Sequence, residues 1–398
     1  MSTRRQLLQA ALATGLLGPA ARLAVAAAAP RADAPRFVFF VLRGGLDGLH
    51  AAPALGDPAF ADARGPLAAF TGFDTPPLKL DATFALHPLL PQLHAMYGRG
   101  ELALLHATGL PYRERSHFDA QQVLESGGTK PHELATGWLA RALAAAGSPG
   151  LRAVALETAV PLSLRGPVAV DTWAPSALPD PSADLVARLE AMYRGDAALA
   201  QALARARGLR DEPGMASNMS GKPDAGRRGV AVELARKAAD FLQRGAQVAV
   251  LEMGGWDSHV NLAQPNGALS NNLRILDTTL AALREGLLAG DTWRRTAVLV
   301  ATEFGREVAG NGTQGTDHGS GGAAFVLGGA VRGGRVIADW PGLAKGQRFE
   351  GRDLRITTDL RAAVRGLLVD HLRIARAAVD EQVLPGSSGV APLELLRG

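Results

Sequence analysis

The chain has 398 residues, of which 47% are hydrophobic and 20% are charged, and it contains no cysteine. This composition excludes a chain that is disordered over most of its length, a collagen-like fibre and a disulfide scaffold. Without cysteine, thiolate zinc sites, iron–sulfur clusters and cysteine nucleophiles are also excluded. The formal net charge of +4 is small, and the basic residues are scattered along the chain. We therefore expect no nucleic-acid partner, and a bound metal ion would be held by His, Asp, Glu or hydroxyl oxygen.

The first 29 residues have the pattern of an export signal. Arg4 and Arg5 begin it, an apolar stretch runs through Leu17, and small residues dominate over residues 24–29. The arginine pair resembles a twin-arginine signal, and the apolar stretch is shorter than the roughly 20 residues of a membrane span. We predict a twin-arginine-type signal peptide over residues 1–29, a periplasmic or secreted mature protein and no stable membrane span. An N-terminal anchor is the alternative.

Short apolar runs alternate with helical patterns along residues 30–398. The runs are typical of buried parallel strands and lie at residues 36–44, 102–109, 247–254, 296–302 and 323–328. The helical patterns lie at about 118–126, 134–147, 182–206, 231–244, 269–289 and 358–371. This alternation predicts a single α/β domain with a mostly parallel central sheet and helices on both faces. The polar, breaker-rich stretch at 211–229 predicts a flexible loop.

Polar side chains follow the ends of these predicted strands. Ligands of open α/β sheets bind beyond the carboxyl ends of the strands, so these side chains are the candidates for a functional site. In chain order they are Arg43, Asp47, Ser116, Asp257, His259, Glu303, Arg306, Asp317 and His318.

Several of these candidates have the chemistry of metal ligands. Asp257 and His259 are two residues apart, so an extended loop presents both to one ion. Glycines flank Asp317 and His318, which suits a close approach of the backbone. Glu303 ends an apolar strand, where burial is costly unless the charge is paired or metal-bound. Mixed carboxylates and imidazoles suit a divalent ion, and Zn²⁺, Mn²⁺, Ca²⁺ and Mg²⁺ all stay open.

Structural roles compete with these functional ones. Asp47 lies between glycines and suits a turn or a helix cap. Ser116 and Asp119 have the spacing of a capping box, which also leaves the helix N-terminus free to stabilise an anion. We expect His117 and Asp119 to support a site and not to react. Four further histidines are expected to have no functional role: His87, His94, His132 and His371.

Taken together, five motifs resemble those of the DUF1501 family over essentially the whole mature chain. They are Arg43-Gly-Gly-Leu-Asp47-Gly, Ser116-His-Phe-Asp-Ala-Gln121, Gly255-Trp-Asp-Ser-His259, Thr302-Glu-Phe-Gly-Arg306 and Gly315-Thr-Asp-His-Gly319. The resemblance implies the alkaline phosphatase and sulfatase fold. By position it makes Ser116 the nucleophile and assigns metal-ligand roles to Asp47, Asp257, His259, Glu303, Asp317 and His318. The chain departs from that pattern at Glu303, where an Asp-His pair is expected.

The resemblance implies an exported metal-dependent hydrolase of phosphate or sulfate esters. Ser116 would attack a small anionic ester, and Arg43, Arg306 or a neighbouring arginine such as Arg113 or Arg115 would grip its phosphate or sulfate. The alternative is a non-catalytic exported binding or assembly protein, for which the family context implies a DUF1800-type exported partner. An oxidoreductase is the least favoured, because the glycine-rich segments do not form G-x-G-x-x-G between strand and helix.

Overall fold

The computed structural model describes residues 33–147, 152–176, 181–211 and 226–398. The predicted signal peptide, residues 1–29, and most of the predicted loop at 211–229 lie outside these residues. Residues 226–229 of that loop are helical, since they form the first turn of a helix, α9 (Gly226–Gln243).

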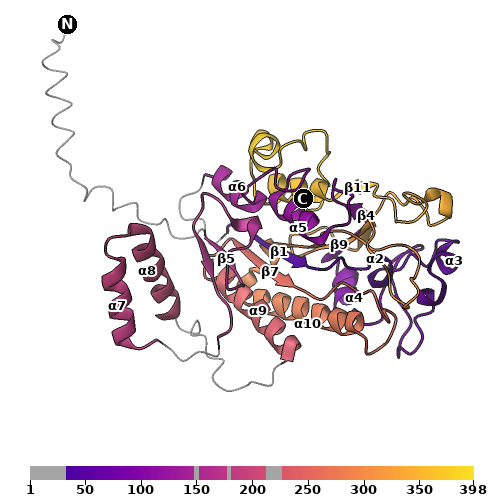
Figure 1. The fold of residues 1–398 in the computed structure, drawn as a ribbon, viewed down its shortest axis with the longest axis horizontal. Helices are drawn as coiled ribbons and strands as arrows, with labels where there is room; N and C mark the ends of the chain where they lie inside the picture. Colours follow the sequence, from indigo (N-terminus) through magenta and orange to yellow (C-terminus); the bar gives the residue numbers. More distant parts are fainter. Residues whose placement is uncertain (1–32, 148–151, 177–180, 212–225) are drawn as a thin grey trace, which may run out of the picture.

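A central sheet of nine strands organises the described residues (Figure 1). Its order is β10-β4-β9-β8-β1-β7-β5-β6, with β11 also paired to β4. The strands are β1 (Arg36–Leu42), β4 (Leu102–Gly109), β5 (Ala153–Ala155), β6 (Val170–Thr172), β7 (Val248–Met253), β8 (Thr296–Thr302), β9 (Gly322–Leu327), β10 (Arg335–Ile337) and β11 (Thr358–Asp359). Only β9 runs antiparallel to its described neighbours, β8 and β4. The predicted mostly parallel α/β sheet is confirmed.

Helices cover both faces of this sheet, and the residues of β1 show why. Phe37, Phe39 and Val41 belong to one buried apolar cluster, while Val38 and Phe40 belong to the other. Successive side chains of a strand point to opposite faces, so a continuously apolar strand needs cover on both. One face carries α4 (Pro91–Gly98), α9 and α10 (Ala268–Leu288); the other carries α5 (His117–Ser126), α6 (Trp138–Ala145) and α11 (Leu360–Gly366).

The predicted helix at 182–206 is wrong in one respect, because it is two helices. They are α7 (Ala183–Tyr193) and α8 (Ala197–Asp211), which lie beside the sheet in Figure 1. The break falls at Gly195 and Asp196, where glycine weakens the helix and the Asp196 carboxylate accepts hydrogen bonds from the backbone N–H groups of the next helix. No residue of α7 is buried.

Several short elements were not predicted. They include α4, β5, β6 and β10, and also α2 (Gly48–Ala51), α3 (Phe60–Arg64), α12 (Arg376–Ala378) and a two-stranded antiparallel sheet of β2 (Leu78–Lys79) and β3 (Ala85–Leu86). The predicted helix at 358–371 starts as strand β11 and ends in a π-helical turn, Leu367–His371. Across the residues that the structure describes, no helix is both long and apolar enough to cross a membrane.

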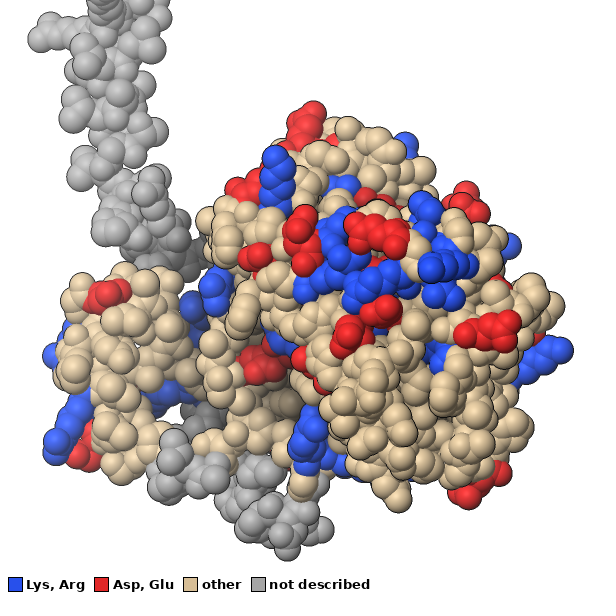
Figure 2. Space-filling view, turned by 45° about the vertical axis from the view of Figure 1, so that its right-hand side comes forward, with Lys and Arg blue, Asp and Glu red and all other residues tan. Residues whose placement is uncertain are grey.

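The parallel register brings the ends of three strands to one edge. Leu42 at the end of β1 pairs with Met253 of β7 and with Thr302 of β8. The segments that follow these strands therefore begin side by side, and they carry most of the candidate residues. On the face shown in Figure 2, basic side chains lie among acidic ones over the upper part of the molecule.

Candidate functional site: a cluster of imidazoles and a carboxylate

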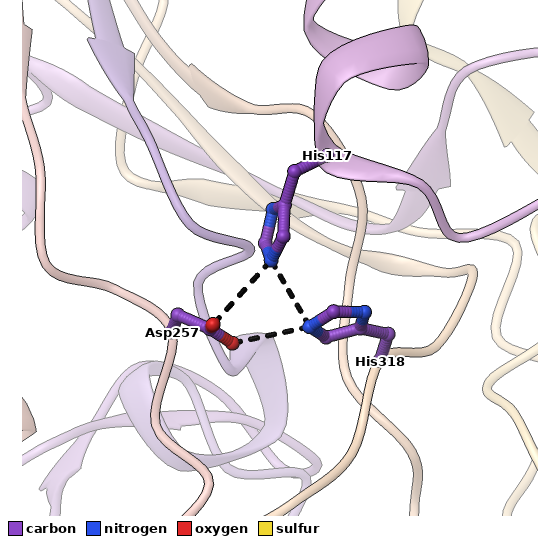
Figure 3. Close-up of side chains that lie close together, drawn as sticks. All are labelled: His117, Asp257 and His318. Atoms are coloured by element: carbon purple, nitrogen blue, oxygen red, sulfur yellow. Dashed lines mark hydrogen bonds and ion pairs between the residues drawn. The ribbon is translucent and has the colours of Figure 1, made fainter.

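Three side chains from separate segments converge at this edge of the sheet (Figure 3). His117 begins α5, Asp257 follows β7, and His318 lies in the loop before β9. The Nε2 atoms of His117 and His318 are 3.0 Å apart. The carboxylate of Asp257 lies 3.1 Å from Nε2 of His318 and 3.5 Å from Nε2 of His117. Ligands about 2.0–2.1 Å from one zinc ion in tetrahedral geometry are about 3.3 Å from each other, so these separations suit a shared cation.

A third imidazole, that of His259, joins the cluster. Its Nε2 lies 3.1 Å from Nε2 of His318 and 2.9 Å from Oδ1 of Asp257. Asp257 also accepts a 2.5 Å hydrogen bond from Nη2 of Arg306, whose side chain is fully buried beneath the cluster. The two residues of the Asp257-x-His259 motif thus face one centre, as their spacing predicts.

Each imidazole is held by its other nitrogen. Nδ1 of His117 lies 2.8 Å from the carboxylate of Glu303, Nδ1 of His259 lies 3.0 Å from that of Asp317, and Nδ1 of His318 lies 3.1 Å from the backbone carbonyl of Arg115. Carboxylates and carbonyls only accept, so each neutral ring carries its proton on Nδ1 and leaves the lone pair on Nε2. Metal-binding histidines are oriented in this way.

With the proton of each imidazole on Nδ1, the Nε2 atoms are free to bind a cation. The Nε2 lone pairs of His117 and His318 and the ionised carboxylate of Asp257 face one another and repel, and a divalent cation between them removes that repulsion. The donor set of His117, His318 and Asp257 is therefore a candidate metal site by its chemistry as well as by its distances, and His259 contacts two of its members.

Glu303 is the buried support of His117. Its Oε1 accepts from Nδ1 of His117, from the backbone N–H of Gly44 at 2.8 Å and from Nε2 of Gln121 at 3.0 Å, and the residue is 1% exposed. Burial acts to raise the pKa of Glu303, but the hydrogen bonds from His117 and Gln121 outweigh it and hold the pKa below its ordinary value. The same hydrogen bond to Glu303 raises the pKa of His117.

Opposing effects set the pKa values of Asp257, Asp317 and His318. Burial acts to raise the pKa of Asp257, but the charge of Arg306 overcomes it and lowers the pKa. Hydrogen bonds from Asn311 and His259 lower the pKa of Asp317. Burial lowers the pKa of His318. Ionised carboxylates beside a neutral His318 are the protonation states that metal binding requires.

Glycines allow the loops of the site to touch. A Cβ on Gly305 would lie 1.8 Å from the carbonyl oxygen of Gly321, and one on Gly315 would lie 2.1 Å from the carbonyl oxygen of His259. No side chain fits at such distances, so the sequence needs glycine at both positions. These contacts place the loop of His318 directly against those of His259 and Arg306.

Two predicted site residues have other partners. The carboxylate of Asp47 caps α2, accepts from Arg64 at 3.0 Å and lies 3.1 Å from the hydroxyl of Thr316. The guanidinium of Arg43 binds Glu252 and Glu125. The structure therefore gives Asp47 and Arg43 structural ion pairs, and it places neither in the cluster.

Ser116 directly precedes His117 and occupies the N-cap position of α5. The expected capping box with Asp119 is wrong, because the Ser116 side chain makes no capping hydrogen bond. Asp119 instead accepts from the hydroxyl of Tyr112 at 3.1 Å. Burial and the hydrogen bond to Asp119 raise the pKa of Tyr112 to about 12.

The fold and the site together define a class of protein: an α/β protein in which imidazoles and a carboxylate converge at the edge of the sheet. The chain belongs to the DUF1501 family, described as a protein of unknown function, whose model matches residues 81–374. No curated protein matches the chain.

Several solved structures are similar to the chain in part. Ps i-CgsB, solved in complex with k-i-k-neocarrahexaose, is 11% identical with a TM-score of 0.44, and the match covers 89% of this chain and 74% of that one. The PsFucS1 sulfatase from Pseudoalteromonas sp. is 13% identical with a TM-score of 0.41 over 91% and 71% of the two chains. The phosphonate monoester hydrolase of Agrobacterium radiobacter is 12% identical with a TM-score of 0.36 over 86% and 74%. Similarity at this level assigns no activity to the chain.

Proposed function

We propose that the protein is an exported metal-dependent hydrolase of phosphate or sulfate esters. The observation that carries the proposal is the convergence of His117, His318 and Asp257, with His259 beside them and each imidazole held at Nδ1 by an acceptor. The motif resemblance supplies the ester class and the alkaline phosphatase-like architecture. The leader pattern of residues 1–29 supports export.

The ligand set favours zinc among the four ions left open by the sequence. Imidazole nitrogen suits Zn²⁺, whereas Ca²⁺ and Mg²⁺ prefer sites made of oxygen alone. One carboxylate and two imidazoles, from Asp257, His117 and His318, make the three protein ligands of a zinc site that keeps a fourth position open. The chemistry that a bound zinc ion supplies is polarisation of an ester oxygen.

The nucleophile that we propose is Ser116. Its hydroxyl is free of a capping role and stands at the N-terminus of α5, where the helix dipole favours a developing oxyanion. Arg306 keeps Asp257 ionised, and Glu303 orients His117. Arg306 also donates to the carbonyl oxygens of Gly45, Thr316 and Trp256. Since those contacts occupy Arg306, we assign it to holding Asp257 in place and not to gripping the ester.

Elemental analysis of protein folded in the cell, followed by ester assays, tests this function. We expect stoichiometric zinc in the wild type, its loss in His318→Ala and its retention in His94→Ala, which removes an imidazole from α4. Ser116→Ala should bind metal and lose ester turnover, while Ser182→Ala, a helix N-cap serine on α7, should keep it. No bound metal, together with unchanged turnover in Ser116→Ala, would refute the proposal.

The second candidate is a non-catalytic exported binding or assembly protein with a DUF1800-type partner. The observation that favours it is the exposure of α7 and α8, on which Leu185, Met192 and Leu199 are exposed. Capture of a stoichiometric partner by the wild type but not by Met192→Lys, combined with a cluster that binds no metal, would favour this function over hydrolysis.

A further inference from the structure

A cavity of about 520 Å³ opens beside the imidazole cluster. Its walls come from residues 62–72, 261–265 and 309–314. Pockets that hold small molecules have volumes of about 300–1,000 Å³, so a ligand of one or two rings fits this one. None of the residues assigned to the candidate metal site lines it.

The cavity and the cluster share their loops. Asn261 lies two residues after the cluster residue His259, and Asn311 lies a few residues before Asp317 and His318. Asn311 lines the cavity, and its Nδ2 donates to Oδ1 of Asp317 and to the carbonyl oxygen of His259, each at 3.0 Å. A ligand in the cavity therefore lies against the same loops that position His259 and His318.

The lining is rich in neutral groups that both donate and accept hydrogen bonds. It includes the amides of Asn261, Gln264 and Gln314 and the hydroxyl of Thr71, whereas the amide of Asn311 is used by contacts within its own loops. The charge of Arg64, which also lines the cavity, is satisfied by Asp47 at 3.0 Å and by the carbonyl of Val308. Asp62 adds a carboxylate that is exposed to solvent.

This lining selects one class of ligand. An apolar ligand would displace water from the amides of Asn261, Gln264 and Gln314 without replacing its hydrogen bonds, which costs binding energy. An anion would meet the Asp62 carboxylate, while the charge of Arg64 is already neutralised by Asp47. A hydroxyl group both donates and accepts, so several hydroxyls on one ring satisfy amides and the Asp62 carboxylate together.

We propose that this cavity binds an uncharged, hydroxyl-rich group such as a sugar ring. If the proposed hydrolase function holds, on which this second step rests, the bound group is the part of the ester that carries the phosphate or sulfate. The cavity then orients the substrate, while the cluster acts on the ester bond.

Direct binding tests the cavity without any assay of turnover. We would follow glucose, galactose and maltose by saturation-transfer NMR on the full chain, with glucuronate and hexanol as charged and apolar comparisons. A neutral sugar should bind, and Gln264→Leu and Thr71→Val should each weaken it by about 3- to 10-fold, the effect of losing one hydrogen bond. Gln201→Leu, the same change on exposed α8, should leave it unchanged.

The same variants separate this proposal from the hydrolase function. Sugar binding should persist in His318→Ala, which removes a metal ligand and not a cavity residue. Sugar binding without ester turnover would refute the hydrolase and keep the cavity assignment. Absence of binding by all three sugars, or equal losses in Gln264→Leu and Gln201→Leu, would overturn the cavity assignment even if the enzyme hydrolyses esters.

Discussion

Replacing Glu303 with glutamine isolates the charge behind the candidate metal site. In the wild type, Oε1 of Glu303 accepts from Gly44, His117 and Gln121, and Oε2 lies 2.9 Å from the hydroxyl of Thr302. A glutamine keeps one acceptor for the same donors and turns its amide toward Thr302, which can accept. Glu303→Gln therefore preserves the hydrogen bonds and removes only the negative charge.

We expect Glu303→Gln to weaken zinc binding by about 10-fold and Glu303→Ala by nearer 100-fold, the range for losing an outer partner of a metal-bound histidine. These losses correspond to about 1.4 and 2.7 kcal/mol. The glutamine keeps His117 in its Nδ1–H form but makes the ring a weaker electron donor, whereas the alanine also releases the ring. The pKa of His117, now raised by Glu303, should return toward its ordinary value of 6.5 in Glu303→Gln.

The assay is competition for zinc between the metal-free protein and a chromophoric chelator, with the pKa of His117 followed by NMR. Glu133→Gln is the matched control, since Glu133 is an exposed carboxylate that accepts hydrogen bonds from Thr129 and Lys130. Unchanged zinc affinity in Glu303→Gln, together with an unchanged pKa of His117, would show that Glu303 does not support a metal-bound imidazole.

Two further predictions concern the stability of the metal-free protein. The pKa of His117 is raised above 6.5, so protonated His117 stabilises the fold below pH 6.5, and this stabilisation is lost as pH rises through the raised pKa. The pKa of His318 is lowered below 6.5, so His318 reduces the stability of the fold as pH falls below 6.5. The contribution of this pair should be greatest near pH 6.5, and calorimetric Tm values of His318→Gln should fall less on the acid side than those of the wild type. Asp47→Asn should cost about 3–5 kcal/mol in urea unfolding, because it leaves the buried Arg64 without its counter-charge. Its zinc affinity should match the wild type, and a lower one would show that Asp47 is a metal ligand.

The strands that carry the site were predictable because they are long and apolar. Every residue of β1 and of β8 is buried, so each strand appears in the sequence as a continuous, mostly apolar run with a clear end. The strands of the central sheet that were missed are β5, β6, β10 and β11, and each has only two or three residues, which is too short for a periodic pattern. Fold class and the edge of the sheet therefore follow from the sequence, whereas the outer strands depend on tertiary packing.

The candidate ligands were predicted unevenly, for physical reasons. The Asp257-x-His259 spacing and the glycines around His318 predict a local backbone geometry, and the folded protein has that geometry. Asp47 has the same local signal, but its partner Arg64 comes from α3, a helix of five residues that no sequence pattern marks. His117 was expected to play a supporting role, because a helix start alone does not show which of its first residues faces the sheet edge.

The position of Glu303 explains how the chain departs from the phosphatase-like pattern. A carboxylate at the end of β8 is buried behind His117, and its Oε1 is fully used by three donors. A residue so placed acts on an ion only through the imidazole. We infer that the carboxylate which the pattern places on the metal holds His117 in this chain, and that His318 supplies the other nitrogen ligand. The cluster therefore points to one cation rather than two, and stoichiometric zinc in the wild type decides the number.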